Sequence, residues 1–155
     1  MMRSKSNAVI NNTTTHYIER LPAIQHILLN KFYRSHASRM RATPGAEAWV
    51  IRNPMIIAGL SLTCVTEGYW LTGLFVAPTQ RKQGIAQYLL KHIQQTYSTL
   101  PIWLFCHQDL TRFYEHSGFR ITEQLPAQLN NRLLRYQKHK NLVAMQYFIE
   151  QASVD

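Results

Sequence analysis

One segment of this 155-residue sequence places residues suited to binding an anion close together. A strand-like run from Leu71 ends at Pro78, a short polar loop follows, and Gly84 precedes residues at helical spacing. This order predicts that unpaired backbone N–H groups and the positive end of a helix point to one place, where Gly84 lets the backbone approach an anion. Arg81 and Lys82 add charge at the rim. Because the spacing is neither P-loop nor G-x-G-x-x-G, it argues against a nucleoside triphosphate or a dinucleotide.

The cysteines and histidines do not have the spacing of a metal site. The sequence contains neither H-E-x-x-H nor C-x-x-C, so we expect no metal. Cys106 and His107 are adjacent, and neighbouring side chains of a strand point to opposite faces. Cys64 and Cys106 each lie in an apolar run, which predicts buried, unreactive thiols rather than a nucleophile.

The periodicity of apolar residues predicts the elements that position these groups. Helical spacing predicts helices near residues 21–32, 84–100, 109–118 and 129–136. Strand patterns cover 48–52, 55–65, 69–76, 101–106, 119–122 and 142–149, and residues 1–15 are expected to be a flexible tail or an edge strand. Trp49, Trp70 and Trp103 are expected in the core. An antiparallel meander joined to a β-α-β unit predicts one domain, residues 1–155, of the α/β (α+β) class.

Composition and charge narrow the class of protein. Apolar residues make up 46% and charged residues 16%, which is typical of a globular protein. The net charge is +9, most of it carried by residues 1–52; such a surface attracts polyanions or simply aids solubility. The apolar stretches are shorter than the roughly 18–20 residues that span a bilayer, and the first residues lack a signal peptide's apolar core. We therefore expect a cytoplasmic protein without a membrane partner.

Two sequence blocks resemble the GNAT acetyltransferase superfamily. Val76–Pro78 followed by Arg81–Ala86 matches a strand end Val-x-Pro and a loop Arg/Gln-x-x-Gly-x-Gly/Ala. Phe113–Phe119 matches the pattern aromatic-Tyr-x-x-x-Gly-Phe. The resemblance covers residues 48–122 well, and it implies a GNAT-like mixed, mostly antiparallel central sheet flanked by helices on both faces.

The resemblance also implies an activity. The chain would be an acyl-CoA-dependent N-acyltransferase that moves an acetyl group from acetyl-CoA to a primary amine by direct attack. Tyr114 matches the tyrosine that protonates the leaving thiolate, and a phenol with a pKa of about 10 is protonated at neutral pH. Backbone amides of Lys82–Gln87 would hold the pyrophosphate, while the backbone of Leu74 and Val76 would pair with the pantetheine. The full set of expected cofactor-binding residues is Leu74, Phe75, Val76, Arg81, Lys82, Gln83, Gly84, Ile85, Ala86 and Gln87.

The group that accepts the amine's proton is less defined. Some members of the family carry a glutamate in the strand that corresponds to 69–76, which here has no carboxylate. His107 stands where the family often has asparagine; it could hydrogen-bond the same neighbours, orient a water or act as a base. Glu67 could act as a base or be a solvated turn residue. Deprotonating an alkyl ammonium of pKa near 10.4 at pH 7 costs roughly 4–5 kcal/mol, whereas deprotonating an α-ammonium costs about 1–1.5 kcal/mol. A site without a strong base therefore favours α-amines.

The acceptor is predicted from the charge of one region. Arg34, Arg39 and Arg41 follow the first helix, and arginine suits bidentate binding of a carboxylate or phosphate. We therefore expect a small-molecule or peptide amine that bears an anionic group, such as an amino acid or a peptide end, rather than a polyamine. Alternatively, the arginines form a solvated face, or the chain is a GNAT-fold binding module for nucleic acid or protein without robust catalysis. We do not expect nucleic acid as a partner, and carboxyl-terminal edge strands are compatible with a homodimer.

Overall fold

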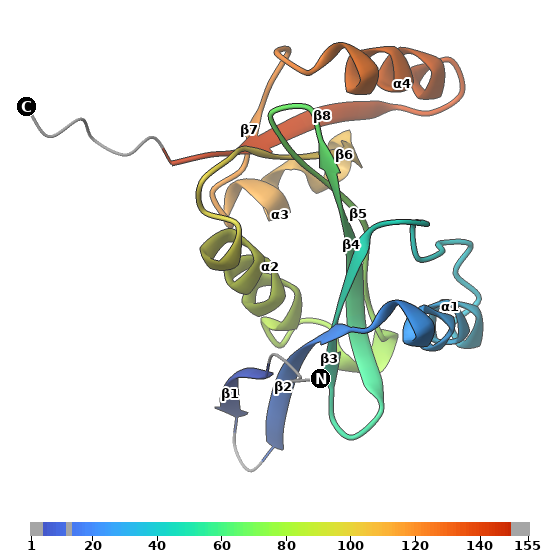
Figure 1. The fold of residues 1–155 in the computed structure, drawn as a ribbon, viewed down its shortest axis with the longest axis vertical. Helices are drawn as coiled ribbons and strands as arrows, with labels where there is room; N and C mark the ends of the chain where they lie inside the picture. The colour runs from blue at the N-terminus through green and yellow to red at the C-terminus, as the bar shows by residue number, and fades with distance from the viewer. Residues whose placement is uncertain (1–4, 12–13, 150–155) are drawn as a thin grey trace, which may run out of the picture. The chain divides into compact units, whose positions relative to one another are not determined.

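The computed structural model describes residues 5–11 and 14–149, with the elements labelled in Figure 1. It divides into two compact units: the residues up to Thr63 with Leu71–Leu90, and Cys64–Trp70 with the residues from Lys91 onward. The strands are β1 (Lys5–Asn11), β2 (Thr14–Leu21), β3 (Glu47–Arg52), β4 (Ile56–Val65), β5 (Gly68–Val76), β6 (Ile102–His107), β7 (Arg120–Ile121) and β8 (Leu142–Tyr147). The α-helices are α1 (His26–Ser35), α2 (Ile85–Thr96), α3 (Thr111–Glu115) and α4 (Ala127–Gln137), and the 3₁₀ helices are η1 (Ala23–Gln25), η2 (Pro78–Gln80) and η3 (Gln108–Leu110).

The sheet of the first unit is an antiparallel meander. Strands β1 to β4 pair in chain order, with Leu21 opposite Ala48 and Ile51 opposite Ala58, and β5 follows β4 in the strand order. The expected edge strand near the amino terminus is confirmed by β1, while residues 1–4 and 12–13 lie outside the described residues. Strand β2 was not predicted, because its polar threonines hide the pattern. Leu21 belongs to this strand and not to the first helix.

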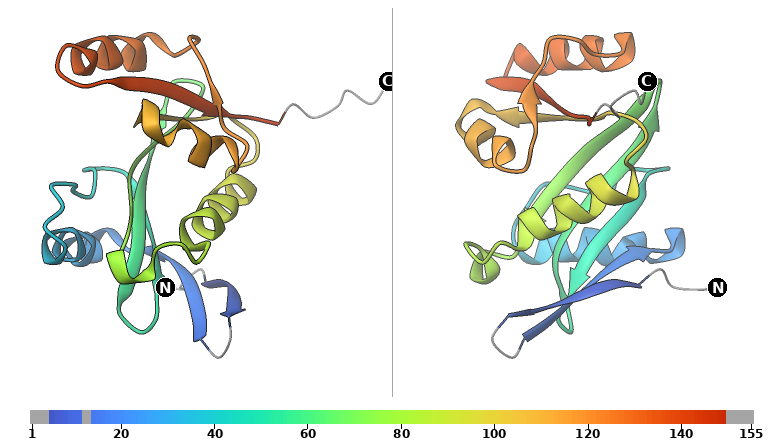
Figure 2. Two further views of the ribbon diagram at one scale, coloured as in Figure 1. Left: turned by 180° about the vertical axis from the view of Figure 1, so that it is seen from behind. Right: turned by 90° about the vertical axis from the view of Figure 1, so that its left-hand side faces the viewer.

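Helix α1 packs against the first unit's sheet through a face that periodicity predicted only in part. The helical pattern included Ile24 and Ile27, yet their exposed fractions are 87% and 66%. Phe32, which belongs to the same pattern, is buried, but its buried partners in the helix are Leu29 and Tyr33. All three lie in a core cluster that also contains Leu21, Ala48 and Val50. The right-hand view of Figure 2 shows α1 behind the strands of this unit and the start of α2 in front of them. The segment 24–35 therefore carries two apolar faces, one buried and one exposed.

The second unit is built around β6. This strand runs parallel to the start of β5, with Tyr69 opposite Ile102, and antiparallel to β8, which also pairs with β7. On one face, Trp103 packs with Leu129 of α4 in a core cluster that includes Trp70. On the other face lies Cys106, close enough to Tyr114 of α3 for its charge to affect the phenol.

These observations confirm the predicted fold class, a mixed α/β fold with a mostly antiparallel sheet and helices on both faces. Trp49, Trp70 and Trp103 are buried as expected. The expectation for Cys64 is wrong: this thiol is exposed, because the buried stretch of β4 ends at Leu62 and Cys64 lies near the turn to β5. Cys106 is buried.

Candidate active site

A tyrosine of α1 fixes the backbone near the end of β5. Gly73 has φ +69°, a left-handed conformation that interrupts the extended strand and suits glycine. The Tyr33 hydroxyl donates to the Gly73 carbonyl at 2.6 Å. A Cβ at Gly73 would lie 2.8 Å from the same hydroxyl oxygen. The expected pantetheine-pairing segment Leu74–Val76 follows immediately, so Tyr33 positions its backbone.

Replacing Tyr33 by phenylalanine is therefore expected to lower the free energy of unfolding by about 1–3 kcal/mol, since the Gly73 carbonyl loses its donor. Urea denaturation measures this change. Tyr17→Phe is the matched control, because Tyr17 is an exposed tyrosine of the same unit. Equal unfolding midpoints for the two variants would show that the hydroxyl does not hold the strand.

The loop between β5 and α2 presents backbone donors. After η2, Lys82 has φ +64° and Gly84 has φ +76°; left-handed residues within a turn are typical of anion-binding backbone concavities. Helix α2 begins at Ile85, and the Tyr88 N–H donates to the Gly84 carbonyl at 3.0 Å. The N–H groups of residues 85–87 precede that bond and have no acceptor within the helix. No atom lies within 4 Å of a Cβ built on Gly84, so the loop opens to free space there.

Arg81 has a structural role that the sequence did not predict. Its Nε donates to the Val76 carbonyl at 2.9 Å, and its guanidinium lies 5.0 Å from the centre of the Phe75 ring. Arg81 therefore fastens the loop to the end of β5 in addition to adding charge. Lys82 is exposed.

The three arginines expected at the acceptor lie in the same unit as this loop. Arg34 is in the last turn of α1, Arg39 and Arg41 lie in the segment that follows, and all three are exposed. The segment is held in place, because the Ala42 N–H donates to Asn30 Oδ1 at 2.7 Å and the Thr43 and Thr72 hydroxyls lie 2.9 Å apart. The arginines are thus carried on an ordered connection.

Tyr114, in the second unit, is buried and held by its neighbours. Its ring packs edge-on against Phe113 and Phe119, with centroid distances of 5.0 and 5.8 Å. Burial raises the pKa of the phenol, and the charge of a Cys106 thiolate would raise it further. Burial also raises the pKa of Cys106 to about 11, so this thiol is not a ready nucleophile. Tyr114 therefore keeps its proton well above neutral pH.

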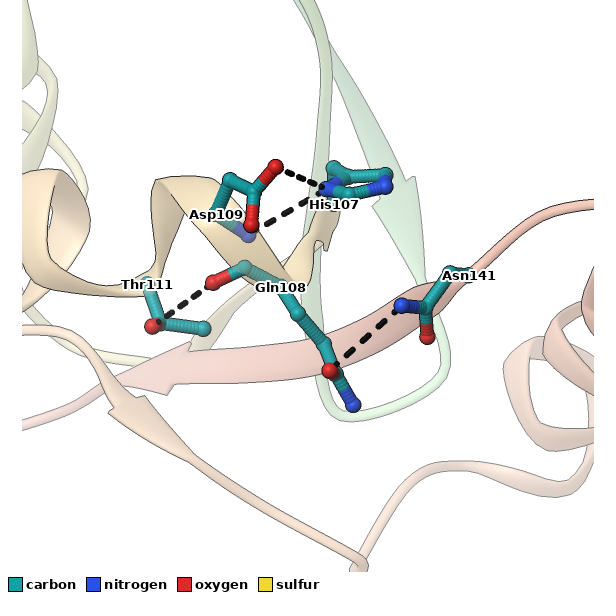
Figure 3. Close-up of polar contacts among 5 residues, drawn as sticks. All are labelled: His107, Gln108, Asp109, Thr111 and Asn141. Carbon is teal, nitrogen blue, oxygen red and sulfur yellow. Dashed lines mark hydrogen bonds and ion pairs between the residues drawn. The ribbon is translucent and has the colours of Figure 1, made fainter.

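His107 ends β6 and caps the 3₁₀ helix that leads to α3 (Figure 3). Its Nδ1 accepts a hydrogen bond from the Asp109 N–H at 3.2 Å, and the Asp109 carboxylate lies 3.3 Å from the same nitrogen. A ring that carries its proton on Nε2 accepts the Asp109 N–H at Nδ1, whereas a ring with a proton on Nδ1 donates to the carboxylate instead. In the first of these forms the exposed Nε2 is a donor.

A polar cleft lies beside Gln108 in the second unit. Its volume is about 490 Å³, and it forms where β6 ends and β8 begins. Asn141 Nδ2 donates to Gln108 Oε1 across it at 3.4 Å (Figure 3). The lining residues, none of them acidic, are Gln108, Gln137, His139, Lys140, Asn141, Leu142 and Val143.

A comparison with protein families decides the relationship. The family model described as "Acetyltransferase (GNAT) domain" matches residues 44–121, half of the chain. The chain belongs to the GNAT acetyltransferase family. The matched residues include β5, the loop 77–84 and α3, which are the parts on which the resemblance depended.

Relatives of this GNAT chain agree with that assignment. Peptidyl-lysine N-acetyltransferase YiaC of Escherichia coli (strain K12) is 31% identical over 65 residues, 41% of this chain and 44% of the relative, so the match spans less than half of each protein. The ribosomal-protein-S18-alanine N-acetyltransferase of Escherichia coli has the same fold, with a TM-score of 0.62 at 14% identity over 90% of this chain and 99% of that one. The structure of Arabidopsis thaliana Naa50 in complex with the bisubstrate analogue CoA-Ac-MVNAL also has this fold. Its TM-score is 0.65 at 14% identity, and the match covers 86% of this chain and 99% of that one.

The structure of this GNAT chain separates two of the expected proton-transfer residues. Glu67 lies in the exposed turn before β5, with φ +67°. Since Tyr69 pairs with Ile102, Glu67 lies before the start of β6, whereas His107 ends that strand. Ile102 and His107 alone are roughly 17 Å apart along the strand. The two residues do not share one site.

Sequence reasoning missed several contacts of this site. The bond from Tyr33 to Gly73 joins residues 40 positions apart, and neither that bond nor the proximity of Cys106 to Tyr114 leaves a local pattern. Among the described residues, no group of three His, Cys, Asp or Glu side chains could hold a metal ion. No helix in the described part of the chain is long and apolar enough to span a membrane.

Proposed function

We propose that this GNAT chain is an acetyl-CoA-dependent N-acetyltransferase that transfers an acetyl group to a primary amine bearing an anionic group. The observation that carries the proposal is the loop from Arg81 to Gln87, with its two left-handed residues and its helix start. The first turn of α2 contains no acidic residue that would occupy those N–H groups. A phosphate group fits such an arrangement.

The residues of the loop and of β5 fit acetyl-CoA. The amides of residues 82–87 would hold the pyrophosphate, and the open space at Gly84 leaves room for it. Leu74, Phe75 and Val76 would pair with the pantetheine, on the backbone that Tyr33 fixes. When bound, acetyl-CoA would supply the acetyl group as an activated thioester.

Tyr114 would donate a hydrogen bond to the leaving sulfur. A phenol whose pKa is raised above about 10 gives up its proton less readily than a thiol with a pKa near 8.5. Complete proton transfer to the thiolate is therefore uphill, and Tyr114 stabilises the developing negative charge chiefly by donating a hydrogen bond. The neutral amine attacks the thioester carbonyl, the C–S bond breaks, and the thiolate finally takes up the proton that the acceptor nitrogen loses as the amide forms.

His107 would orient a water through its Nε2–H. In the tautomer whose Nδ1 accepts the Asp109 N–H, the exposed edge of the ring is a donor. Glu67 fits the turn role better than the role of a base beside His107, since the two lie at opposite ends of β6. Without a strong base at the site, acceptors whose amines are partly neutral at pH 7, such as α-amines, are favoured.

The acceptor would carry a carboxylate or phosphate. Arg34, Arg39 and Arg41 suit such a group, and the lining of the cleft beside Gln108 offers amides and the Lys140 ammonium but no carboxylate. A polyamine would meet positive charge in both places.

An amine screen tests this function. Thiol release from acetyl-CoA should be faster with amino acids and acidic peptides than with spermidine or kanamycin, at low and moderate salt. Arg39→Gln with Arg41→Gln should raise KM for the anionic amines by about three- to tenfold. Arg135→Gln, an exposed arginine of α4, is the control.

Two results would contradict the proposal. Spermidine or kanamycin outperforming every anionic amine would overturn the acceptor class. A steeply salt-dependent shift of DNA without any turnover would favour a binding module instead of an enzyme.

A further inference from the structure

The solvent-facing side of α1 and η1 carries apolar residues that do not pack in the core. Ile24, Ile27 and Leu28 are exposed, and the helical repeat continues from them to Lys31 and Arg34. These five residues, the α1 outer face, present an apolar end and a basic end along one helix. The buried residues Leu29, Phe32 and Tyr33 lie on the other side.

The surroundings of the α1 outer face are basic. No aspartate or glutamate occurs between Arg20 and Glu47. Arg39 and Arg41, in the connection after α1, extend the positive charge. An occupant of this face therefore meets apolar side chains at one end and the basic side chains of Lys31 and Arg34 at the other.

A second copy of this chain does not complement that pattern, because the chain has a net charge of +9. A membrane surface is also less suited. Helices that lie in a membrane interface typically combine a longer apolar face with aromatic residues, whereas this face has three aliphatic residues and no aromatic one. A helical segment with leucine-like residues followed by glutamates or aspartates matches it in both shape and charge.

We propose that the α1 outer face binds an acidic, amphipathic polypeptide segment of the acceptor, so that the acceptor is a protein or peptide and not a free amino acid. The statement that the bound segment belongs to the acceptor rests on the proposed function. The binding of such a segment to the α1 outer face does not. The apolar end of the segment packs on Ile24, Ile27 and Leu28, and its acidic end pairs with Lys31 and Arg34.

Binding is tested with a peptide that cannot be acetylated. The probe is a lysine-free amphipathic helix with leucines at helical spacing, glutamates toward one end and blocked termini, and its binding is followed by fluorescence anisotropy without acetyl-CoA. The intact chain should bind it, binding should weaken as salt increases, and a glutamine version of the peptide should bind about tenfold more weakly.

Variants assign that binding to the face. Ile24→Gln with Ile27→Gln should weaken it by about tenfold, while Leu134→Gln, an exposed leucine of α4, should not. Lys31→Glu should weaken it, whereas Lys91→Glu on α2 should not. Thiol release with a small anionic amine should be the same in all four as in the parent, which separates this inference from failure of the enzyme assignment.

Three outcomes would overturn the inference. They are no binding of the acidic peptide, equal binding by the double isoleucine variant, and binding of phosphatidylserine vesicles through Ile24 and Ile27 in place of the peptide.

Discussion

Tyr114→Phe is expected to lower kcat by about 10²–10⁴-fold, because the hydroxyl that stabilises the leaving sulfur is removed. The phenylalanine ring retains the edge-on contacts with Phe113 and Phe119, so the fold and CoA affinity should change little. Steady-state kinetics with isothermal titration of CoA separates the two effects. Tyr136→Phe, an exposed tyrosine of α4, is the control, and a Tyr114 variant within threefold of the parent would leave this residue as packing alone.

The pH dependence provides a second readout of Tyr114. Burial raises the pKa of its phenol, so the hydroxyl remains a donor above pH 10, where an ordinary tyrosine would begin to ionise. The difference in kcat between the parent and the Phe variant should therefore persist through pH 10. A difference that disappears between pH 9 and 10 would contradict the buried environment.

Gly84→Glu is expected to raise the dissociation constant of CoA at least tenfold, about 1.4 kcal/mol. The new side chain would enter the open space at the helix start and place a carboxylate at the proposed phosphate position. Gly84 also has φ +76°, so any side chain there strains the backbone.

Gly45 provides a matched control for this strain. It has φ +77° and likewise no atom within 4 Å of an added Cβ. Gly45→Glu should therefore lower the melting temperature about as much as Gly84→Glu while leaving CoA affinity unchanged. If the two variants bind CoA equally, the loop after β5 is not the pyrophosphate site.

Local pattern in the sequence was sufficient for most of the elements, strand β2 excepted, and for the loop after β5. A helix start after Gly84 and a strand end at Val76 depend on residues within a few positions, which spacing reveals. The same holds for the short helix that carries Tyr114. Because these features occur in the same order along the chain as in the GNAT family, they indicated that family before any contact was known.

Local pattern was not sufficient for choosing between faces. Ile24, Ile27 and Leu28 recur at helical spacing as regularly as a core stripe, yet the sheet covers Leu29, Phe32 and Tyr33. Periodicity describes one helix at a time, whereas burial depends on which neighbouring strand offers a complementary surface.

Only the tertiary structure decided the contacts that set the hydrogen bonding and protonation of the candidate site residues. Tyr33 reaches Gly73 across 40 positions of sequence, and Cys106 lies beside Tyr114 because α3 folds back onto β6. The cap on His107 Nδ1 depends on the backbone turn that brings the Asp109 N–H to it. Residue type and spacing in the sequence therefore determined which chemical groups this protein has, while their protonation and hydrogen bonding follow from burial and distance, which exist only once the chain has folded.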